Sequence, residues 1–133
     1  MSLRWYTLVI DCHDPHAQAH WWAEALDMQV FLEFEKEVVV LPKHLPTEPL
    51  TAENWTSVGP GMVFVPVPED KTVKNRLHLD LAPHLSDDRD AEIDRLIGLG
   101  ARRVEVGQPA DAEFTVLADP EGNEFCVLSA RER

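Results

Sequence analysis

The sequence is poor in cysteine and in basic residues. Its two cysteines, Cys12 and Cys126, are far apart and belong to no C-x-x-C pair, which argues against a zinc ribbon and a disulfide framework. The sequence has 12 basic and 24 acidic residues, and the formal net charge of -12 would repel a phosphate backbone or an anionic lipid surface. We therefore expect reduced thiols, and neither nucleic acid nor a membrane as a partner.

Long apolar stretches are also missing. No run approaches the roughly 20 apolar residues that cross a bilayer, and the N-terminal residues lack the layout of a signal peptide. These absences predict a cytoplasmic protein. With 133 residues, 44% of them hydrophobic, the chain is long and apolar enough to bury a core, so residues 1–133 are predicted to form a single domain.

Hydrophobic periodicity predicts the same order of elements twice: strand, helix, strand, strand, strand. The first helix is expected to begin at Pro15, with Asp14 as its N-cap, and to end near Asp27. The second is expected to follow residues 86–88 and to stop at Gly100. The predicted strands are residues 5–11, 28–35, 37–41, 62–67, 76–81, 102–106, 114–118 and 124–129.

This repeated order predicts an α+β fold in which two βαβββ modules form a curved, partly open mixed sheet around a cavity. Module one is expected at about residues 4–68 and module two at about residues 75–130. Thr7 and His78 occupy equivalent places on the first strands of the two modules.

Module one contains a long irregular segment, residues 42–61. It carries four of the ten prolines and shows no sustained period, which predicts a loop. A long loop in a compact domain is either a functional lid or disordered, and Trp55 is the candidate anchor of such a lid.

Three segments carry a family resemblance: LVIDCHDPHAQAHWWAEAL (residues 8–26), VPEDKTVKNRLHLDL (residues 67–81) and FTVLADPEGNEFCVL (residues 114–128). They resemble the vicinal oxygen chelate superfamily of glyoxalases, bleomycin resistance proteins and extradiol dioxygenases, and within it the glyoxalase-like domain subfamily. The resemblance implies the glyoxalase-like fold and a homodimer. It implies no single activity, because the superfamily includes isomerases, dioxygenases, epimerases, lyases and binding proteins.

The resemblance also implies where a metal ion would bind. Metalloenzymes of the superfamily hold one divalent ion with His, Gln or Glu side chains from the first and fourth strands of each half. In this chain those places carry Thr7, no His, Asp or Glu within residues 62–67, then His78, and Cys126 in place of Glu. We therefore expect no cofactor and no ancestral divalent metal. If an ion does bind, His78 and Cys126 are its candidate ligands, and they would favour zinc.

Two of these residues have competing interpretations. His78 is either a general base or hydrogen-bond donor in the cavity, tuned by Asp80 on the same sheet face, or a histidine satisfied within the core. Cys126 is either a nucleophile or ligand, which requires nearby positive charge, or a small buried apolar residue.

Three other groups of polar residues could each bind a ligand or have only a structural role. His16 and His20 fall on one helical face, as a two-histidine metal site requires, but an exposed polar face is the interpretation we favour. The D-P-E-G-N stretch, residues 119–123, is predicted to be a turn and not a calcium loop. One basic cluster either docks an anionic ligand group or is a solvated surface: Lys71, Lys74 and Arg76.

Taken together, these features predict a protein that binds a small, partly apolar molecule in its cavity. The alternative is a lyase or isomerase in which His78 moves a proton next to a carbonyl. A third prediction is an interaction domain with a vestigial cavity. Sequence alone thus leaves an enzyme and a binding protein in competition. The residues predicted to line the cavity are Thr7, Trp22, Val65, His78 and Cys126.

Overall fold

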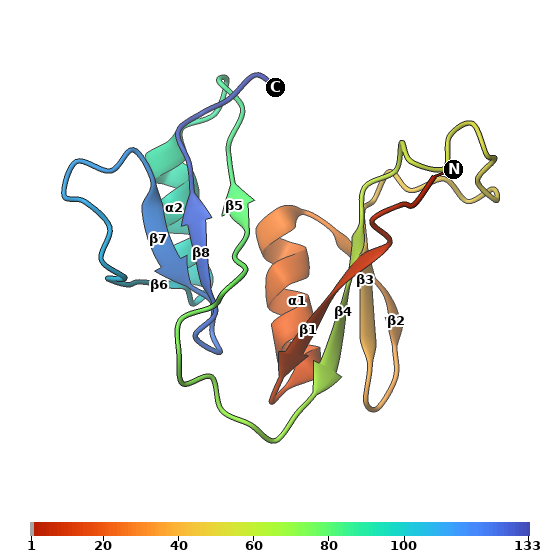
Figure 1. Cartoon of the computed structure of the whole chain (residues 1–133), viewed down its shortest axis with the longest axis horizontal. Coiled ribbons are helices and arrows are strands. Elements are labelled where there is room, and N and C mark those ends of the chain that lie inside the picture. Colours follow the sequence, from red (N-terminus) through yellow and green to blue (C-terminus); the bar gives the residue numbers. More distant parts are fainter. Residues whose placement is uncertain (1) are drawn as a thin grey trace. The chain divides into compact units, whose positions relative to one another are not determined.

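The same order of elements occurs twice along the chain (Figure 1). The computed structural model describes residues 2–133, which divide into a first unit that runs up to Glu69 and a second unit, Asp70–Arg133. Within these residues there are two helices and eight strands, and each unit contains one helix and one four-stranded mixed sheet. The predicted α+β class and the two βαβββ modules are therefore confirmed. That residues 1–133 act as a single domain stays a prediction.

The first unit contains a sheet with the strand order β1-β4-β3-β2. β1 runs parallel to β4, and the remaining neighbours are antiparallel. A bulge between Val30 and Leu32 shifts the register of β2 against β3. The elements of this unit are β1 (Thr7–Cys12), α1 (Pro15–Leu26), β2 (Gln29–Glu33), β3 (Val38–Leu41) and β4 (Gly61–Pro66).

Helix α1 begins and ends where the sequence predicts. The side chain of Asp14 accepts a hydrogen bond from a backbone N–H of the first turn at 3.1 Å, Pro15 follows it, and Asp27 closes the helix in the left-handed conformation. The helix contacts all four strands and buries one face. Trp21 and Trp22 are both buried, with ring centroids 5.0 Å apart in an edge-to-face arrangement.

Alternate residues of β3 and β4 form the core of the first unit. Since successive side chains of a strand point to opposite faces, this core also defines the other face of the sheet, on which Thr7 and Val65 lie. Burying one large apolar side chain contributes roughly 1.5–3 kcal/mol to stability. The core side chains of β3 and β4 are Val38, Val40, Met62 and Phe64.

The segment between β3 and β4 contains no helix or strand, so the predicted loop is confirmed. The guanidinium of Arg4 lies 4.5 Å from the ring centroid of Trp55 and 4.8 Å from that of Tyr6. These cation–π contacts connect the loop to the residues before β1. The anchoring role of Trp55 has a physical basis, while a lid function stays a prediction.

The second unit repeats the strand order as β5-β8-β7-β6, with β5 parallel to β8 and antiparallel pairs elsewhere. Asp88 caps α2 by accepting hydrogen bonds from two backbone N–H groups, and the helix ends at Gly100. Ile93 and Leu96 of this helix are buried. The elements of this unit are β5 (Asp80–Leu81), α2 (Arg89–Leu99), β6 (Arg102–Arg103), β7 (Thr115–Ala118) and β8 (Glu124–Val127).

Two strands of the second unit are shorter than the alternation predicts. Residues 76–81 were expected to form a strand, but the backbone pairs with β8 only from Leu79 onward, and Leu77 is 88% exposed. Residues 102–106 bond to β7 only as far as the Val104 N–H, which donates to the Val116 carbonyl. Beyond it, the side chain of Gln108 accepts a hydrogen bond from the Val106 N–H and donates one to the Val104 carbonyl. A side chain thus replaces the expected strand partner.

The D-P-E-G-N segment is a turn between β7 and β8, as predicted. The buried carboxylate of Asp119 accepts hydrogen bonds from the backbone N–H groups of Glu121 and Asn123, both at 3.0 Å. Gly122 has a φ of 92°, which side-chain-bearing residues rarely adopt. These contacts fix the entry into β8.

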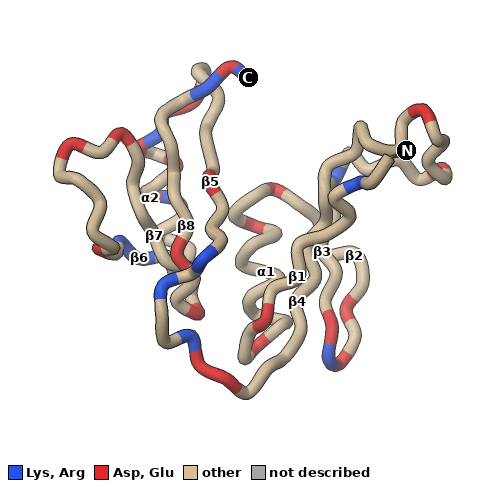
Figure 2. The backbone as a smooth tube through the Cα atoms, viewed as in Figure 1, with Lys and Arg blue, Asp and Glu red and all other residues tan. Residues whose placement is uncertain are grey.

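The distribution of charge is uneven (Figure 2). Acidic residues occur throughout both units, while basic residues gather in a few places, one of which is the segment that precedes β5. Among residues 2–133, no helix combines the length and apolar character that a membrane crossing requires.

Candidate functional site

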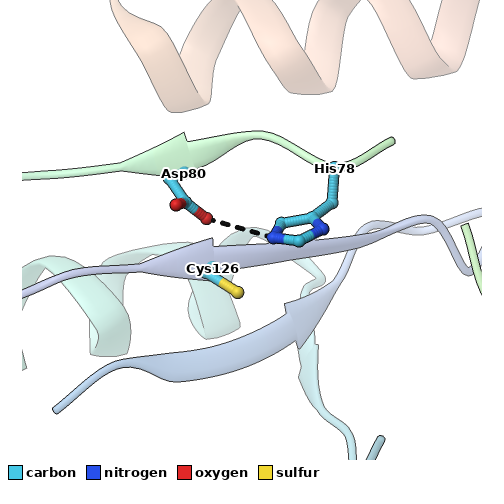
Figure 3. A group of neighbouring side chains, drawn as sticks. All are labelled: His78, Asp80 and Cys126. Atoms are coloured by element: carbon cyan, nitrogen blue, oxygen red, sulfur yellow. Dashed lines mark ion pairs between the residues drawn. The ribbon is translucent and has the colours of Figure 1, made fainter. Parts of the chain in front are cut away.

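Three polar side chains converge in the second unit, where β5 lies beside β8 (Figure 3). Asp80 and Cys126 are Cα partners in the parallel pair, and the Cys126 N–H donates to the Leu79 carbonyl at 2.9 Å. His78 lies two residues before Asp80 and so shares its face. One potential ligand atom from each of His78, Asp80 and Cys126 lies within 4.8 Å of the other two. Backbone pairing therefore places Asp80 beside Cys126, and His78 joins them from the segment just before β5.

His78 and Asp80 form an ion pair when the histidine is protonated. The distance from His78 Nε2 to Asp80 Oδ1 is 3.3 Å, and the two side chains are 39% and 49% exposed. At this exposure the pair contributes little to stability, in the range of about 0–1 kcal/mol. Its effect is orientation, since the carboxylate holds the imidazole by one nitrogen and leaves the ring accessible. The interpretation of His78 as a core histidine is therefore disfavoured.

Cys126 is almost completely buried, at 7% exposure. Burial raises the pKa of its thiol, and the Asp80 carboxylate raises it further, while Lys74 acts in the opposite direction. The thiol is therefore protonated at neutral pH and is not activated as a nucleophile.

A pocket of about 290 Å³ adjoins these side chains. His78, Asp80 and Cys126 lie on its wall together with Lys74 and Gln108. The remaining wall is largely apolar and includes Val106, Phe114, Val116 and Leu128. An apolar wall with a few polar groups at one side is the usual composition of a small-molecule site.

The segment between β6 and β7 forms part of this wall. The hydrogen bonds of Gln108 to Val106 N–H at 2.8 Å and to the Val104 carbonyl at 3.1 Å hold it in a tight turn. A second cavity of about 440 Å³ shares Gln108, Phe114 and Val116 with the first. Sequence reasoning missed these residues, although the alternation of residues 114–118 could have placed Phe114 and Val116 on one face.

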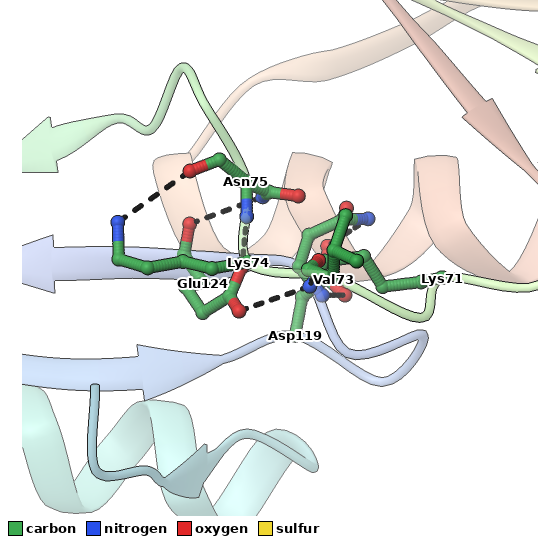
Figure 4. Close-up of polar contacts among 7 residues, drawn as sticks. Lys71, Val73, Lys74, Asn75, Asp119 and Glu124 are labelled. Carbon is green, nitrogen blue, oxygen red and sulfur yellow. Dashed lines mark hydrogen bonds and ion pairs between the residues drawn. The ribbon is translucent and has the colours of Figure 1, made fainter.

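Glu124 fixes the segment that precedes β5 (Figure 4). Its carboxylate accepts a hydrogen bond from the Asn75 N–H at 3.0 Å and forms an ion pair with Lys71 at 2.9 Å. Burial alone would raise the pKa of Glu124, but the Asn75 N–H and Lys71 outweigh it, and the pKa is lowered. Two lysines of the predicted basic cluster therefore differ in their surroundings. Lys71 forms an ion pair with Glu124, while Lys74 lines the pocket.

The predicted cavity residues fall into two groups. The structure brings His78 and Cys126 together in the second unit, whereas Thr7, Trp22 and Val65 belong to the first. Within residues 2–133, the Oγ1 of Thr7 is buried without a hydrogen-bond partner. Trp22 is 3% exposed, and Val65 is half-buried. That all five line one cavity stays a prediction.

The histidines of α1 contact a carboxylate of β2. His16 Nδ1 and His20 Nε2 both lie 2.9 Å from Glu33 Oε1, and all three side chains are substantially exposed. Their ligand atoms do not meet the spacing of a metal-binding group, a test that covered residues 2–133. The observed arrangement matches the exposed polar face that we favoured.

A model of the glyoxalase-like domain family matches residues 7–128. This match spans nearly the whole chain and includes both units. The chain belongs to the glyoxalase-like domain family. A comparison with curated proteins finds no match.

Solved structures of the vicinal oxygen chelate superfamily share the fold of this glyoxalase-like protein. A glyoxalase/bleomycin resistance protein/dioxygenase family enzyme from Burkholderia phytofirmans matches with a TM-score of 0.67 at 14% identity, covering 97% of this chain and 100% of the other. The fosfomycin resistance protein FosX from Listeria monocytogenes, solved with Mn(II) and a dihydroxypropylphosphonic acid, matches with a TM-score of 0.67 at 10% identity, covering 99% and 93%. FosX from Mesorhizobium loti gives 0.67 at 12%, covering 99% and 95%. These identities establish the fold alone.

The divalent ion that the superfamily resemblance implies can be tested against the donors in this chain. Thr7 is a poor ligand, and β4 carries no His, Asp or Glu. In the second unit the structure adds Asp80 to the predicted pair of His78 and Cys126, which gives one nitrogen, one oxygen and one sulfur donor. Ions such as Mn²⁺ prefer oxygen-rich octahedral sites, so this glyoxalase-like protein does not fit the metal of its metalloenzyme relatives.

Proposed function

We propose that this glyoxalase-like protein binds a small, partly apolar molecule in the pocket of its second unit. The observation that carries the proposal is the composition of the pocket wall, in which Phe114 and its apolar neighbours face a polar side formed by His78, Asp80 and Lys74. Its volume of about 290 Å³ lies at the lower end of the range typical of ligand sites. A compound with one ring or a short chain and one polar group suits these dimensions.

Further support comes from the chemistry of the polar side. Lys74 supplies a positive charge, and His78 supplies a donor or an acceptor according to its tautomer. A carbonyl, carboxylate or hydroxyl group of the ligand would find a partner there, while Phe114 would contact a ring or an alkyl group. FosX from Listeria monocytogenes, solved with a small phosphonic acid, gives a precedent for a ligand of this size on the same fold. Binding of this kind does not require the divalent ion of the metalloenzymes.

A thermal-shift screen of small aromatic and aliphatic carbonyl compounds and carboxylic acids tests the proposal. A ligand at 100 times its Kd stabilises the native state by about 2.7 kcal/mol, so a true ligand should raise the Tm in a saturable manner. Phe114→Ala should abolish the shift. The matched control is Phe31→Ala, which removes an exposed phenylalanine of β2. A screen with no saturable stabiliser, or a hit that Phe114→Ala leaves unchanged, would contradict the proposal.

A lyase or isomerase is the second candidate function, and the His78–Asp80 pair favours it. A carboxylate 3.3 Å from Nε2 orients the imidazole, as a general acid or base requires. Proton transfer next to a carbonyl would exchange that hydrogen for deuterium in D2O. NMR of each pocket ligand with wild-type protein should show this exchange, and His78→Gln should stop it. Exchange at the same rate in both proteins would exclude His78 as the base.

The proposal also covers the oligomeric state, the partners and the cellular location of the protein. The resemblance supports a homodimer, and the charge of -12 supports a partner that is neither nucleic acid nor an anionic membrane. A cytoplasmic location belongs to the same proposal. Light scattering coupled to size-exclusion chromatography tests the dimer, since a mass near 15.1 kDa at micromolar concentration would contradict it.

A further inference from the structure

We propose that Gln108 determines the size of the molecule that the pocket of the second unit admits. Its side chain separates this pocket from the neighbouring cavity of about 440 Å³, so that only a compact molecule, with one ring or a short chain, fits. This inference rests on the proposed function and extends it from the presence of a ligand to the size of that ligand.

The pocket and the cavity share part of their lining. Gln108, Phe114 and Val116 are common to both, so these three residues lie where the two spaces adjoin. All residues that line the cavity belong to one segment, 103–116, whereas the pocket is also lined by residues of β5 and β8. The cavity is larger than the pocket, so an opening at this boundary would change the admitted size substantially.

The three boundary residues are fixed in different ways. Val116 is buried in β7, where strand pairing sets its position, and Phe114 directly precedes that strand. Gln108 belongs to the irregular segment between β6 and β7 (Figure 1). Its amide bonds to the backbone of Val104 at 3.1 Å and of Val106 at 2.8 Å. The place of Gln108 at the boundary therefore depends on these two hydrogen bonds.

Both ends of the Gln108 amide are used. Oε1 accepts from the Val106 N–H and Nε2 donates to the Val104 carbonyl, so a flipped amide would bring like groups together. A side chain that left the boundary would deprive one backbone donor and one backbone acceptor of their partners, which is unfavourable. Gly107 has a φ of 89°, a conformation that favours glycine and permits the tight turn. The sequence of this turn thus favours a closed boundary.

A compact ligand follows from this boundary. Within about 290 Å³, one ring can contact Phe114 while a polar group reaches the side formed by His78, Asp80 and Lys74. A second ring or a longer chain would need the space that Gln108 closes off. The ligand class is therefore a one-ring or short-chain compound with one polar group.

The reactivity of Cys126 measures the admitted size without a ligand. Cys126 lies on the pocket wall, and in the full-length chain with Cys12→Ser it is the only thiol. N-ethylmaleimide and N-pyrenylmaleimide carry the same reactive group on substituents of very different size, and each rate is divided by that of the same reagent with glutathione. Gln108→Ala should raise the rate of the pyrenyl reagent several-fold and leave that of the ethyl reagent nearly unchanged. Gln29→Ala, at an exposed glutamine of β2, should change neither.

The ratio of the two rates is decisive, because a general loosening of the structure would raise both rates together. An unchanged ratio in Gln108→Ala, or an equal rise in both rates, would overturn the proposal.

Hydrogen exchange gives an independent measurement of the closed boundary. The Val106 N–H should be protected in the wild type and lose its protection in Gln108→Ala. The Val104 N–H, which donates to the Val116 carbonyl, should keep its protection in both proteins. Rapid exchange of the Val106 N–H in the wild type would contradict the hydrogen bond on which the proposal depends.

Benzoic acid and naphthoic acid test the size limit with ligands. Benzoic acid should raise the Tm of the wild type more than naphthoic acid does, and Gln108→Ala should reduce or reverse this difference. A larger shift of the wild type with naphthoic acid would overturn the proposal. A screen without any stabiliser contradicts the proposed function, whereas the maleimide rates decide the role of Gln108 whatever that screen gives.

Discussion

In the first unit, β1 and β4 pair over six residues, whereas the corresponding strands of the second unit, β5 and β8, pair over two. The strand orders are the same, so the difference lies in side chains and ladder length. The regular unit presents Thr7 and valines where the irregular unit presents the cluster of Figure 3. The comparison teaches that one scaffold can present small and apolar side chains in one copy and ionisable side chains at the equivalent places in the other.

The register of the two parallel strand pairs, β1 with β4 and β5 with β8, allows the two units to be compared residue by residue. If Thr7 is equated with His78, then Val9 corresponds to Asp80, and their strand partners, Val63 and Cys126, correspond as well. Two residues earlier on the fourth strand, Gly61 corresponds to Glu124. Equivalent places thus carry small or apolar residues in one unit and ionisable residues in the other. The equivalent sets are Thr7, Val9, Gly61 and Val63, and His78, Asp80, Glu124 and Cys126.

The largest effect is expected when one buried phenylalanine is replaced in either unit. Comparing the two variants tests whether both units contribute equally to the free energy of unfolding. Phe64 and Phe125 are 0% and 1% exposed, and Phe64→Ala or Phe125→Ala should each cost about 3–5 kcal/mol because of lost burial and the resulting cavity. Urea denaturation measures both. The exposed Phe31→Ala should stay within about 0.5 kcal/mol of wild type. A cost below about 1 kcal/mol for only one core variant would show that its unit is not packed as described.

Gly61→Ala tests why the first unit has glycine where the second has Glu124. A Cβ atom at Gly61 would lie 2.9 Å from the Val40 carbonyl oxygen and 2.8 Å from a Leu41 methyl group. The backbone has little room to move, so the substitution should cost about 1–3 kcal/mol in thermal or urea unfolding. Gly59→Ala is the matched control, since no atom lies within 4 Å of its Cβ position. Equal stability of the two variants would refute the steric explanation.

Glu124→Gln removes a charge that only the second unit carries at this place. Loss of the Lys71 ion pair and weakening of the Asn75 hydrogen bond should cost about 1–2 kcal/mol at neutral pH. Because the pKa of Glu124 is lowered in the folded state, its contribution is present above the unfolded pKa of about 4.3 and is lost as pH falls through the folded value. Wild-type protein should therefore lose its advantage over the variant on acidification.

The control for this pH series is Glu132→Gln, which removes an exposed carboxylate near the C-terminus. It should follow the wild-type profile throughout. A constant difference between Glu124→Gln and wild type from neutral to acidic pH would show that the charge of Glu124 has no part in its effect.

Glu33→Gln should give the smallest effect, confined to the exposed histidines of the first unit. The hydrogen bond to Glu33, followed by one to the Glu35 carbonyl, raises the pKa of His16. Its contribution is fully present below the unfolded pKa of about 6.5 and is lost as pH rises through the folded value. The Tm difference between wild type and variant should therefore be larger at about pH 6 than at about pH 8. His44→Gln should show no such trend, and an unchanged difference for Glu33→Gln would exclude the histidine contribution.

The sequence predicted the fold well where local signals and packing agree. Asp14 and Pro15 fix the start of α1 through capping and a preset φ, and Asp119 fixes the last turn through its own carboxylate. Alternation overestimated β6, because no periodicity rule anticipates that Gln108 would bond to the backbone of residues 104–106. Local patterns reveal propensity, but not the competition between a side chain and a neighbouring strand.

The candidate site was only partly predictable. His78 and Cys126 followed from the family resemblance, which implies ligand places on their strands, and Asp80 was recognised as the neighbour of His78 on one face. The contact between Asp80 and Cys126 depends on pairing across more than 40 residues, which no local pattern encodes. The same holds for Phe114 and Gln108, which reach the pocket from an irregular segment.

The repeated register also makes the molecule a scaffold for redesign. The side chains of His78, Asp80 and Cys126 could be introduced at the equivalent places of the first unit, where the strand pairing is longer and more regular. The substitutions are Thr7→His, Val9→Asp and Val63→Cys. Gly61 would remain, since its close contacts leave no room for a side chain such as that of Glu124. A chain with both sets would contain the same cluster of ionisable side chains twice, and the wild-type cluster of the second unit would serve as the reference for the introduced one.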